Sequence, residues 1–297
     1  MTDATLDGGE GRGDSAGEAL RDACRTFARA LGGRSRAWVV AASGVADVAR
    51  ELGLDAGSVA TPLGGVPLAM TDVRVLARRR DARPADERTP LVLDVSLTSA
   101  LGCPAGRLGA DVALASLDRV VRRRDCGMVM VGLRREALQG RNGCEGLADA
   151  VAALPAPDDA LVCELARSMA DYDQRRRTAN DNAQVAAAFL RCHPAVAEVR
   201  YPGLTDDPSY EAGAANLEDG FGPLVDAKFA QGVGRDLARD WHAELCGSYV
   251  PGGTASSARV LQDDSGALWL RVECGCGDPK ELVVALEALL GSMGKRV

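Results

Sequence analysis

The chain has 297 residues, 46% of them hydrophobic and 26% charged, and its formal net charge at pH 7 is -7. This length can bury one large core or two of ordinary size, and the acidic balance argues against nucleic acid, because phosphate binding needs a concentrated positive field. No apolar run approaches the roughly 18–20 residues that span a bilayer, and the polar N-terminus lacks a signal-peptide pattern. We therefore expect a cytoplasmic protein with no membrane partner, whose nine cysteines are reduced thiols.

The first 160 residues predict a tail followed by an α/β domain. Residues 1–16 are rich in Gly and Asp and hold almost nothing apolar, so we expect them to be disordered. Residues 17–160 alternate short apolar runs with segments of helical periodicity, which is typical of a mostly parallel sheet covered by helices. The expected helices are 18–31, 45–52 and 73–80, and the expected strands are 38–42, 90–94, 110–115 and 128–131.

Residues 161–297 predict a smaller α+β domain. It begins with a long helix over 161–190, either continuous or interrupted near 178–182. The closing helix has Asp278 as its N-cap and Pro279 at its first position. The other expected elements are strands at 196–201, 224–229 and 269–274 and a helix at 235–245.

Polar residues follow three of the predicted strands of the first domain. Ser43 and Gly44 form a turn before a helix, where unpaired backbone N–H groups can bind an anion. Asp94 and Ser116 end two further strands, at the edge where open parallel sheets place ligands. A plain turn or a strand-end cap explains the same residues without a ligand.

Four blocks, in order along the chain, carry a resemblance. They are ALGGRSRAWVVAASGVADV, TPLGGVPLAMTDV, the pair LVLDVSLTS and LGADVALASLDR, and the pair NAQVAAAFLRCHPAVAEVRYPGL and LRVECGCGDPKELVVALEALL. Together they resemble the Cys/Met-metabolism family of pyridoxal phosphate (PLP) enzymes, the group of cystathionine γ-synthase, cystathionine lyase and methionine γ-lyase. The resemblance implies a truncated large domain of the aspartate-aminotransferase type (fold type I) and a smaller α+β C-terminal domain.

The resemblance also implies roles for single residues. Asp94 falls where the family keeps the cofactor's ring nitrogen protonated, which makes the ring an electron sink. Ser43, Gly44 and Ser116 fall where the family binds the cofactor's phosphate. Arg271, seven residues before Asp278, falls where an arginine binds the substrate carboxylate.

One departure from the family pattern concerns the reacting lysine. The resemblance requires a lysine 25 residues after Asp94, and Arg119 stands there. A guanidinium stays protonated and cannot form the Schiff base that a deprotonated lysine forms. The chain has three lysines, Lys228, Lys280 and Lys295, and none falls at a matching position.

Other parts of the family pattern are missing as well. The segment with the ring-stacking tyrosine has no counterpart between Gly57 and Thr61, and the N-terminal arm that reaches a neighbouring subunit has none before Glu18. Val95 replaces the asparagine that follows the family's aspartate. Ring stacking, covalent attachment and the contribution from a second subunit are therefore all expected to be lost.

Neither the cysteines nor the histidines predict a metal site. Cys274 and Cys276 form an isolated C-x-C without a second pair at metal-ligand spacing, so we interpret them as buried thiols. His193 lies in a turn that ends a helix and His242 lies in the expected helix 235–245. We interpret both as structural residues, because no nucleophile is placed beside them.

Three functions remain open on this basis. The first is a degenerate homologue, a pseudoenzyme that binds PLP non-covalently or not at all and serves as a binding, regulatory or partner subunit. The second is an active C–S lyase or γ-replacement enzyme of cystathionine and methionine metabolism (transsulfuration), whose lysine must come from elsewhere, for example from another chain. The third is non-covalent binding of a small phosphate- or carboxylate-bearing ligand by Arg119. We expect a homo-oligomer or a complex with a full-length paralogue, since family members pair their large domains.

Overall fold

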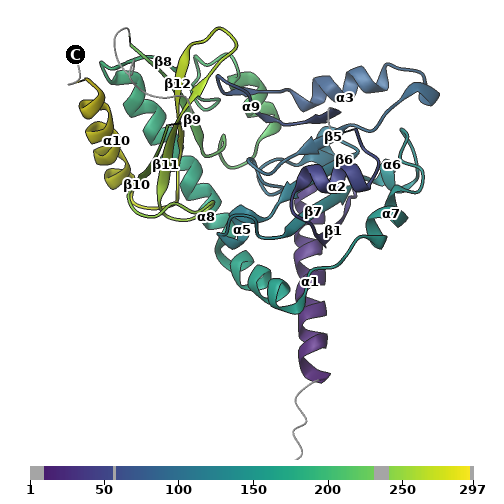
Figure 1. The fold of residues 1–297 in the computed structure, drawn as a ribbon. Helices are drawn as coiled ribbons and strands as arrows, with labels where there is room; N and C mark the ends of the chain where they lie inside the picture. Colours follow the sequence, from purple (N-terminus) through teal and green to yellow (C-terminus); the bar gives the residue numbers. More distant parts are fainter. Residues whose placement is uncertain (1–9, 56–57, 231–240, 295–297) are drawn as a thin grey trace, which may run out of the picture.

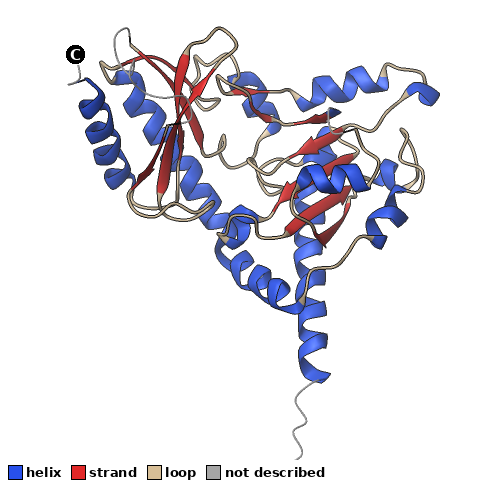
Figure 2. Ribbon diagram, in the orientation of Figure 1, coloured by secondary structure: helices blue, strands red, loops and turns tan. Residues whose placement is uncertain are grey.

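The computed structural model describes residues 10–55, 58–230 and 241–294. The chain forms an α/β domain and a C-terminal α+β domain, joined by the long helix α8 (Asp159–Cys192) (Figure 1). Figure 2 shows the strands of the two domains as two separate sheets. This architecture agrees with the predicted fold class.

The sheet of the first domain has five strands in the order β1-β7-β6-β5-β2. β7 runs antiparallel to both of its neighbours, whereas β2, β5 and β6 are parallel to one another. Four strands therefore share one direction, as the alternation of strands and helices predicted. The strands are β1 (Arg36–Ala41), β2 (Val59–Ala60), β5 (Val92–Asp94), β6 (Val112–Ser116) and β7 (Met128–Leu133).

Helices cover both faces of this sheet. One face packs against α1 through Phe27 and Leu31 and against α8 through Leu165. The other face packs against α2 through Val48 and against α7 through Val151. Burial on both faces explains why the central strands are continuous apolar runs instead of alternating ones. The other elements of this domain are α1 (Glu10–Leu31), α2 (Val45–Glu51), β3 (Leu63–Gly64), β4 (Ala69–Met70), α3 (Val73–Asp81), the 3-10 helix Ala85–Glu87, α4 (Ala105–Leu108), α5 (Asp118–Val121), α6 (Arg135–Leu138) and α7 (Leu147–Ala153).

The first helix is longer than predicted. α1 begins at Glu10, so residues 10–16 of the expected disordered tail are helical, while residues 1–9 lie outside the described part of the chain. Ala16 is buried, and once that turn is packed, each further residue gains a helical hydrogen bond at little cost. Composition predicted a shorter helix because it contains no information about the packing of Ala16.

The C-terminal domain is an antiparallel sheet in the order β10-β11-β12-β9-β8. One face packs against α8 and α10 in a core that includes Leu190, Leu270 and Leu286. The other face carries the polar residues of alternating positions, among them Arg271 and Glu273 on β12. The elements after α8 are β8 (Val196–Arg200), α9 (Tyr210–Asn216), β9 (Leu224–Phe229), β10 (His242–Leu245), β11 (Ser256–Gln262), β12 (Leu268–Glu273) and α10 (Pro279–Gly294).

Two predictions for this domain need correction or resolution. The expected helix at 235–245 is wrong at its end, because residues 242–245 form β10 and pair with β11, while 235–240 lie outside the described residues. His242 is therefore an exposed strand residue.

The long helix α8 is continuous through 178–182, where the Asn182 amide donates to the carbonyls of Gly275 (2.8 Å) and Gly277 (2.9 Å). The polar residues that suggested an interruption instead anchor the helix to neighbouring loops.

Candidate functional site

The ends of β1, β5 and β6 bring the sequence-predicted residues to one edge of the first sheet. Asp94 ends β5 and Ser116 ends the adjacent strand β6. Ser43 and Gly44 follow β1, which is two strand positions from β6, or about 10 Å at ordinary strand spacing. Gly44 caps the short helix α2.

Asp94 is engaged in a local hydrogen-bond network with Ser96. The Asp94 Oδ1 atom accepts from the Ser96 backbone N–H at 2.9 Å and from the Ser96 hydroxyl. The Ser96 Oγ atom in turn accepts from the backbone N–H of Ser116 at 2.9 Å. This network links β5 to β6, as an aspartate that bonds two residues onward commonly does in a turn.

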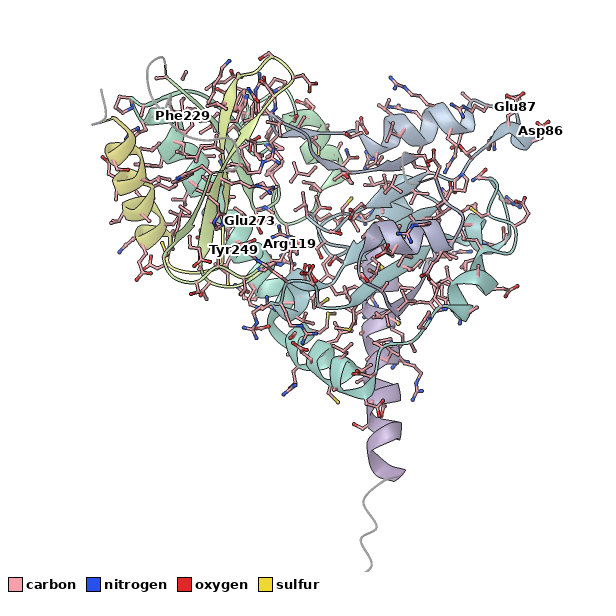
Figure 3. All side chains as sticks on the ribbon, viewed as in Figure 1. Asp86, Glu87, Arg119, Phe229, Tyr249 and Glu273 are labelled. Carbon is pink, nitrogen blue, oxygen red and sulfur yellow. The ribbon has the colours of Figure 1, made fainter. Side chains whose placement is uncertain are left out.

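Arg119, in the first turn of α5, forms an ion pair with the C-terminal domain. Its Nη2 atom lies 2.7 Å from Glu273 Oε1 on β12, and the Tyr249 hydroxyl donates to the same oxygen. The side chains of Arg119 and Glu273 are only 15% and 17% exposed. Figure 3 shows Arg119, Tyr249 and Glu273 together where the two domains meet.

The electrostatics of this group favour a charged arginine. Burial acts to lower the pKa of Arg119, but the charge and hydrogen bond of Glu273 together with Tyr249 and Tyr172 outweigh it, and the pKa is raised above its ordinary value. Burial and the same carboxylate raise the pKa of Tyr249. The phenol therefore stays protonated and can donate its hydrogen bond to Glu273.

A cavity of about 170 Å³ lies beside this ion pair. It is formed by residues of both domains, and the interface between domains is a common place for ligand sites. Ser43, Gly44, Asp94 and Arg271 do not line it. Its lining residues are Ser96, Ser116, Asp118, Arg119, Tyr249, Pro251 and Glu273.

Arg175 of α8 fixes the loop that carries Tyr249 against α5. Its Nη1 atom donates to the Gly252 carbonyl at 2.7 Å, and its Nη2 atom donates to the Val120 carbonyl at 2.8 Å. Gly252 has a φ of +68°, and a Cβ atom there would lie 2.1 Å from the Arg119 carbonyl oxygen. The close approach of the two segments therefore requires glycine.

Arg271, which was expected to bind a substrate carboxylate, has an internal ion-pair partner. Its Nε and Nη2 atoms lie 2.7 Å from the two carboxylate oxygens of Asp226, and Nη2 also donates to the Gly65 carbonyl. Asp226 is fully buried and accepts from the Leu68 N–H at 2.6 Å. The ion pair joins β12 to β9, and the hydrogen bonds of Arg271 to Gly65 and of Leu68 to Asp226 join these strands to the loop between β3 and β4. The role of Arg271 toward a substrate carboxylate stays a prediction.

The cavity residues do not fit a covalently bound PLP. No lysine is among them: Lys228 lies on β9 with its Nζ 5.6 Å from the Trp269 ring centroid, and Lys280 lies in the first turn of α10. Lys295 is outside the described residues. The volume of about 170 Å³ is also below the roughly 300–1,000 Å³ of typical ligand and cofactor pockets.

Two cavity residues were missed by sequence reasoning although signals for them existed. Glu273 stands two residues after Arg271, and the alternation of a strand places both on one face. Ser96 stands two residues after Asp94, the spacing of an aspartate turn. Tyr249 and Asp118 carried no such signal, because their place in the cavity depends on how the two domains meet.

The described residues contain no group of three or more His, Cys, Asp or Glu side chains that could hold a metal ion. Cys274 is buried, which raises its pKa, and Cys276 is half-buried. The His193 Nδ1 atom accepts from the Ala195 N–H at 3.1 Å, which caps the turn after α8.

Among the residues that the structure describes, no helix is long and apolar enough to cross a membrane.

Solved structures with the same fold include a lyase and a synthase. A methionine gamma lyase from Micromonospora echinospora matches with a TM-score of 0.69 and 20% identity, over 92% of this chain and 85% of that one. A cystathionine gamma synthase from Xanthomonas oryzae pv. oryzae matches with a TM-score of 0.69 and 18% identity, over 100% and 92% of the two chains. The chain has the fold type I architecture of these enzymes.

Curated relatives carry related names. The chain is 32% identical over 122 residues to a cystathionine gamma-lyase of Sus scrofa, covering 41% of this chain and 29% of the lyase. It is 27% identical over 240 residues to a cystathionine gamma-synthase of Mycobacterium tuberculosis, covering 75% of this chain and 59% of the synthase. The chain thus spans less than two thirds of the length of these relatives. A family model described as Cys/Met metabolism PLP-dependent enzyme matches residues 64–234, more than half of the sequence, so the chain belongs to this family.

Proposed function

We propose that this protein is a degenerate member of the family, which lacks Schiff-base catalysis and acts as a binding, regulatory or partner subunit. The observation that carries the proposal is Arg119, which stands at the position expected for the lysine and is paired with Glu273 at 2.7 Å. A guanidinium held by a carboxylate cannot lose the proton that blocks its attack on a carbonyl. No lysine among the described residues lines the cavity beside it.

The surroundings of the expected cofactor site support the same proposal. The Asp94 carboxylate accepts two hydrogen bonds from Ser96, and the Arg271 guanidinium is paired with Asp226. Both groups have internal partners, so each serves the fold without a bound ligand. A scaffold that keeps its core while its reactive groups acquire internal partners suits a protein that binds instead of reacting.

The test is covalent capture. Purified protein is mixed with PLP and reduced with borohydride, and the intact chain is then weighed, with an active cystathionine gamma-synthase treated in parallel as a positive control. We expect the synthase to gain one reduced cofactor and this protein to gain none at stoichiometric level. A stoichiometric adduct on a single lysine of this protein would refute the proposal.

Partner binding is the second part of the proposal. We propose a homo-oligomer or a complex with a full-length paralogue, because the family resemblance implies that large domains pair. Light scattering at micromolar concentration should give a mass above 30.9 kDa, that of one chain. A monomer that also fails to bind the paralogue contradicts it. Covalent capture that appears only on mixing would instead favour an active lyase or γ-replacement enzyme that takes its lysine from the partner.

Non-covalent binding of a small anion in the cavity is the alternative within the same site. Arg119 uses Nη2 for Glu273, and the hydroxyls of Ser116 and Tyr249 line the same cavity of about 170 Å³. Guanidinium groups bind phosphate and carboxylate through paired N–H donors. Calorimetry with inorganic phosphate separates this alternative, because saturable binding that is lost in Arg119→Gln supports it and an absence of heat contradicts it.

A further inference from the structure

Glu273 lies beside Arg119 in the cavity, with its Oε1 atom 2.7 Å from Arg119 Nη2. We propose that Glu273 is a second, independent determinant, because its carboxylate would hold an amine at position 119 as an ammonium ion, which cannot attack a carbonyl. The inference rests on the proposed function and deepens it. Restoring lysine at 119 would then be insufficient to restore covalent binding.

The position of Glu273 supports this reasoning. Its Oε1 atom accepts both from Arg119 Nη2 at 2.7 Å and from the Tyr249 hydroxyl, so the carboxylate is fixed from two sides. A lysine side chain is one atom shorter than arginine, and its Nζ would remain within ion-pair range of this oxygen. With both partners mostly buried, solvent screens their attraction only weakly.

Other charged groups near Arg119 do not replace Glu273. Arg175 on α8 donates to the Arg119 carbonyl at 3.3 Å, and its N–H groups are also used by Asp171 at 2.9 Å and by other backbone carbonyls. Asp118 accepts the Cys126 N–H at 2.9 Å through its own Oδ1. Four segments contribute titratable or charged groups around position 119. They are β12 with Glu273, the loop after β10 with Tyr249, α8 with Tyr172 and Arg175, and α5 itself with Asp118. Arg124 lies 5.4 Å from the Tyr249 ring. Among these, Glu273 is the anion that forms an ion pair with the position.

The experiment compares three variants with PLP capture as the readout. Arg119→Lys carries the restored lysine, Arg119→Lys/Glu273→Gln also loses the carboxylate, and Arg119→Lys/Glu244→Gln is the matched control. Glu244 is exposed on β10 of the same sheet and does not line the cavity. Each variant is incubated with PLP across a range of pH, reduced with borohydride and digested, and the labelled fraction at residue 119 is measured by mass spectrometry.

We expect labelling of residue 119 at pH 7.5 to be at least about tenfold higher in Arg119→Lys/Glu273→Gln than in Arg119→Lys, since one pKa unit changes the free-amine fraction about tenfold. The control should behave like Arg119→Lys. The ratio should stay nearly constant below the ordinary lysine pKa of about 10.4 and shrink only at higher pH, where both amines lose their protons.

Two outcomes overturn the inference. Equal labelling of Arg119→Lys and Arg119→Lys/Glu273→Gln at pH 7.5 would mean that Glu273 has no influence, while the proposed function would stand. No labelling of either variant at any pH, with both folded by circular dichroism, would mean that removing both determinants does not open the site. Failure of the proposed function itself is distinguishable, because it requires capture by the unmodified protein.

Discussion

The substitution Asp226→Asn tests the contribution of the Arg271–Asp226 ion pair to stability. The substitution keeps the shape of the side chain but removes its charge. Asp226 is fully buried and accepts three hydrogen bonds of 2.6–2.7 Å, two from Arg271 and one from the Leu68 N–H. Asparagine offers a single acceptor oxygen and leaves the buried Arg271 charge without a counter-ion. Breaking a buried pair from one side costs about 3–5 kcal/mol, so the free energy of unfolding should fall by about that amount.

Urea denaturation followed by circular dichroism measures this loss. The control is Glu218→Gln, which removes the partner of Arg107 in an exposed ion pair of the same chemistry. Exposed pairs contribute about 0–1 kcal/mol, so the control should lose little. If Asp226→Asn costs no more than Glu218→Gln, the Arg271 guanidinium does not depend on Asp226. Arg271 would then remain available for a substrate carboxylate, as the family resemblance implied.

Three further predictions concern the loop near α5, the end of β12 and the thiols. Gly252→Ala should destabilise the protein by more than Gly247→Ala, because both glycines have positive φ but only a Cβ at 252 meets the Arg119 carbonyl oxygen; equal urea midpoints would contradict this. Hydrogen bonds from Ser265 and Trp269 lower the pKa of Asp263 to about 2. Because the folded-state pKa is depressed, the stabilisation is present above about pH 4 and is lost as the pH falls through about 2, which a titration of Trp269 fluorescence should follow; a midpoint near 4 would refute it. In native protein, iodoacetamide should label the exposed thiols before the buried ones, and a mass spectrum with the opposite order would contradict the assigned burial. The exposed thiols are Cys163, Cys192 and Cys246, and the buried ones whose pKa burial raises to about 12 are Cys103, Cys126 and Cys144.

Local signals in the sequence were sufficient for many elements. A helix was predicted over 73–80, and α3 begins at Val73, where the carboxylate of Asp72 accepts the N–H groups of Arg74 and Val75. The strand prediction 224–229 coincides with β9. Both features depend on residues that are neighbours in the chain, namely a side chain that bonds two or three residues onward and an apolar run of strand length.

The sequence predicted helices and strands less well where neighbouring residues gave no clear helix or strand pattern. β10 and β11 mix small and polar residues with apolar ones, and their pairing with each other and of β11 with β12 defines them. α1 starts earlier than its composition suggested, because a packed turn propagates the helix. These elements depend on contacts that propensity does not encode.

The sequence by itself determined the family, most of the helices and strands of the first domain, and the presence of an arginine where the resemblance requires a lysine. Only the tertiary structure decided what that arginine does. Arg119 and Glu273 are far apart in the chain, and their contact exists because the two domains meet there. The same holds for Arg271, whose partner Asp226 lies on a neighbouring strand. The sequence shows which charged groups are present, but the fold selects their partners, because the strength of an ion pair depends on distance and burial.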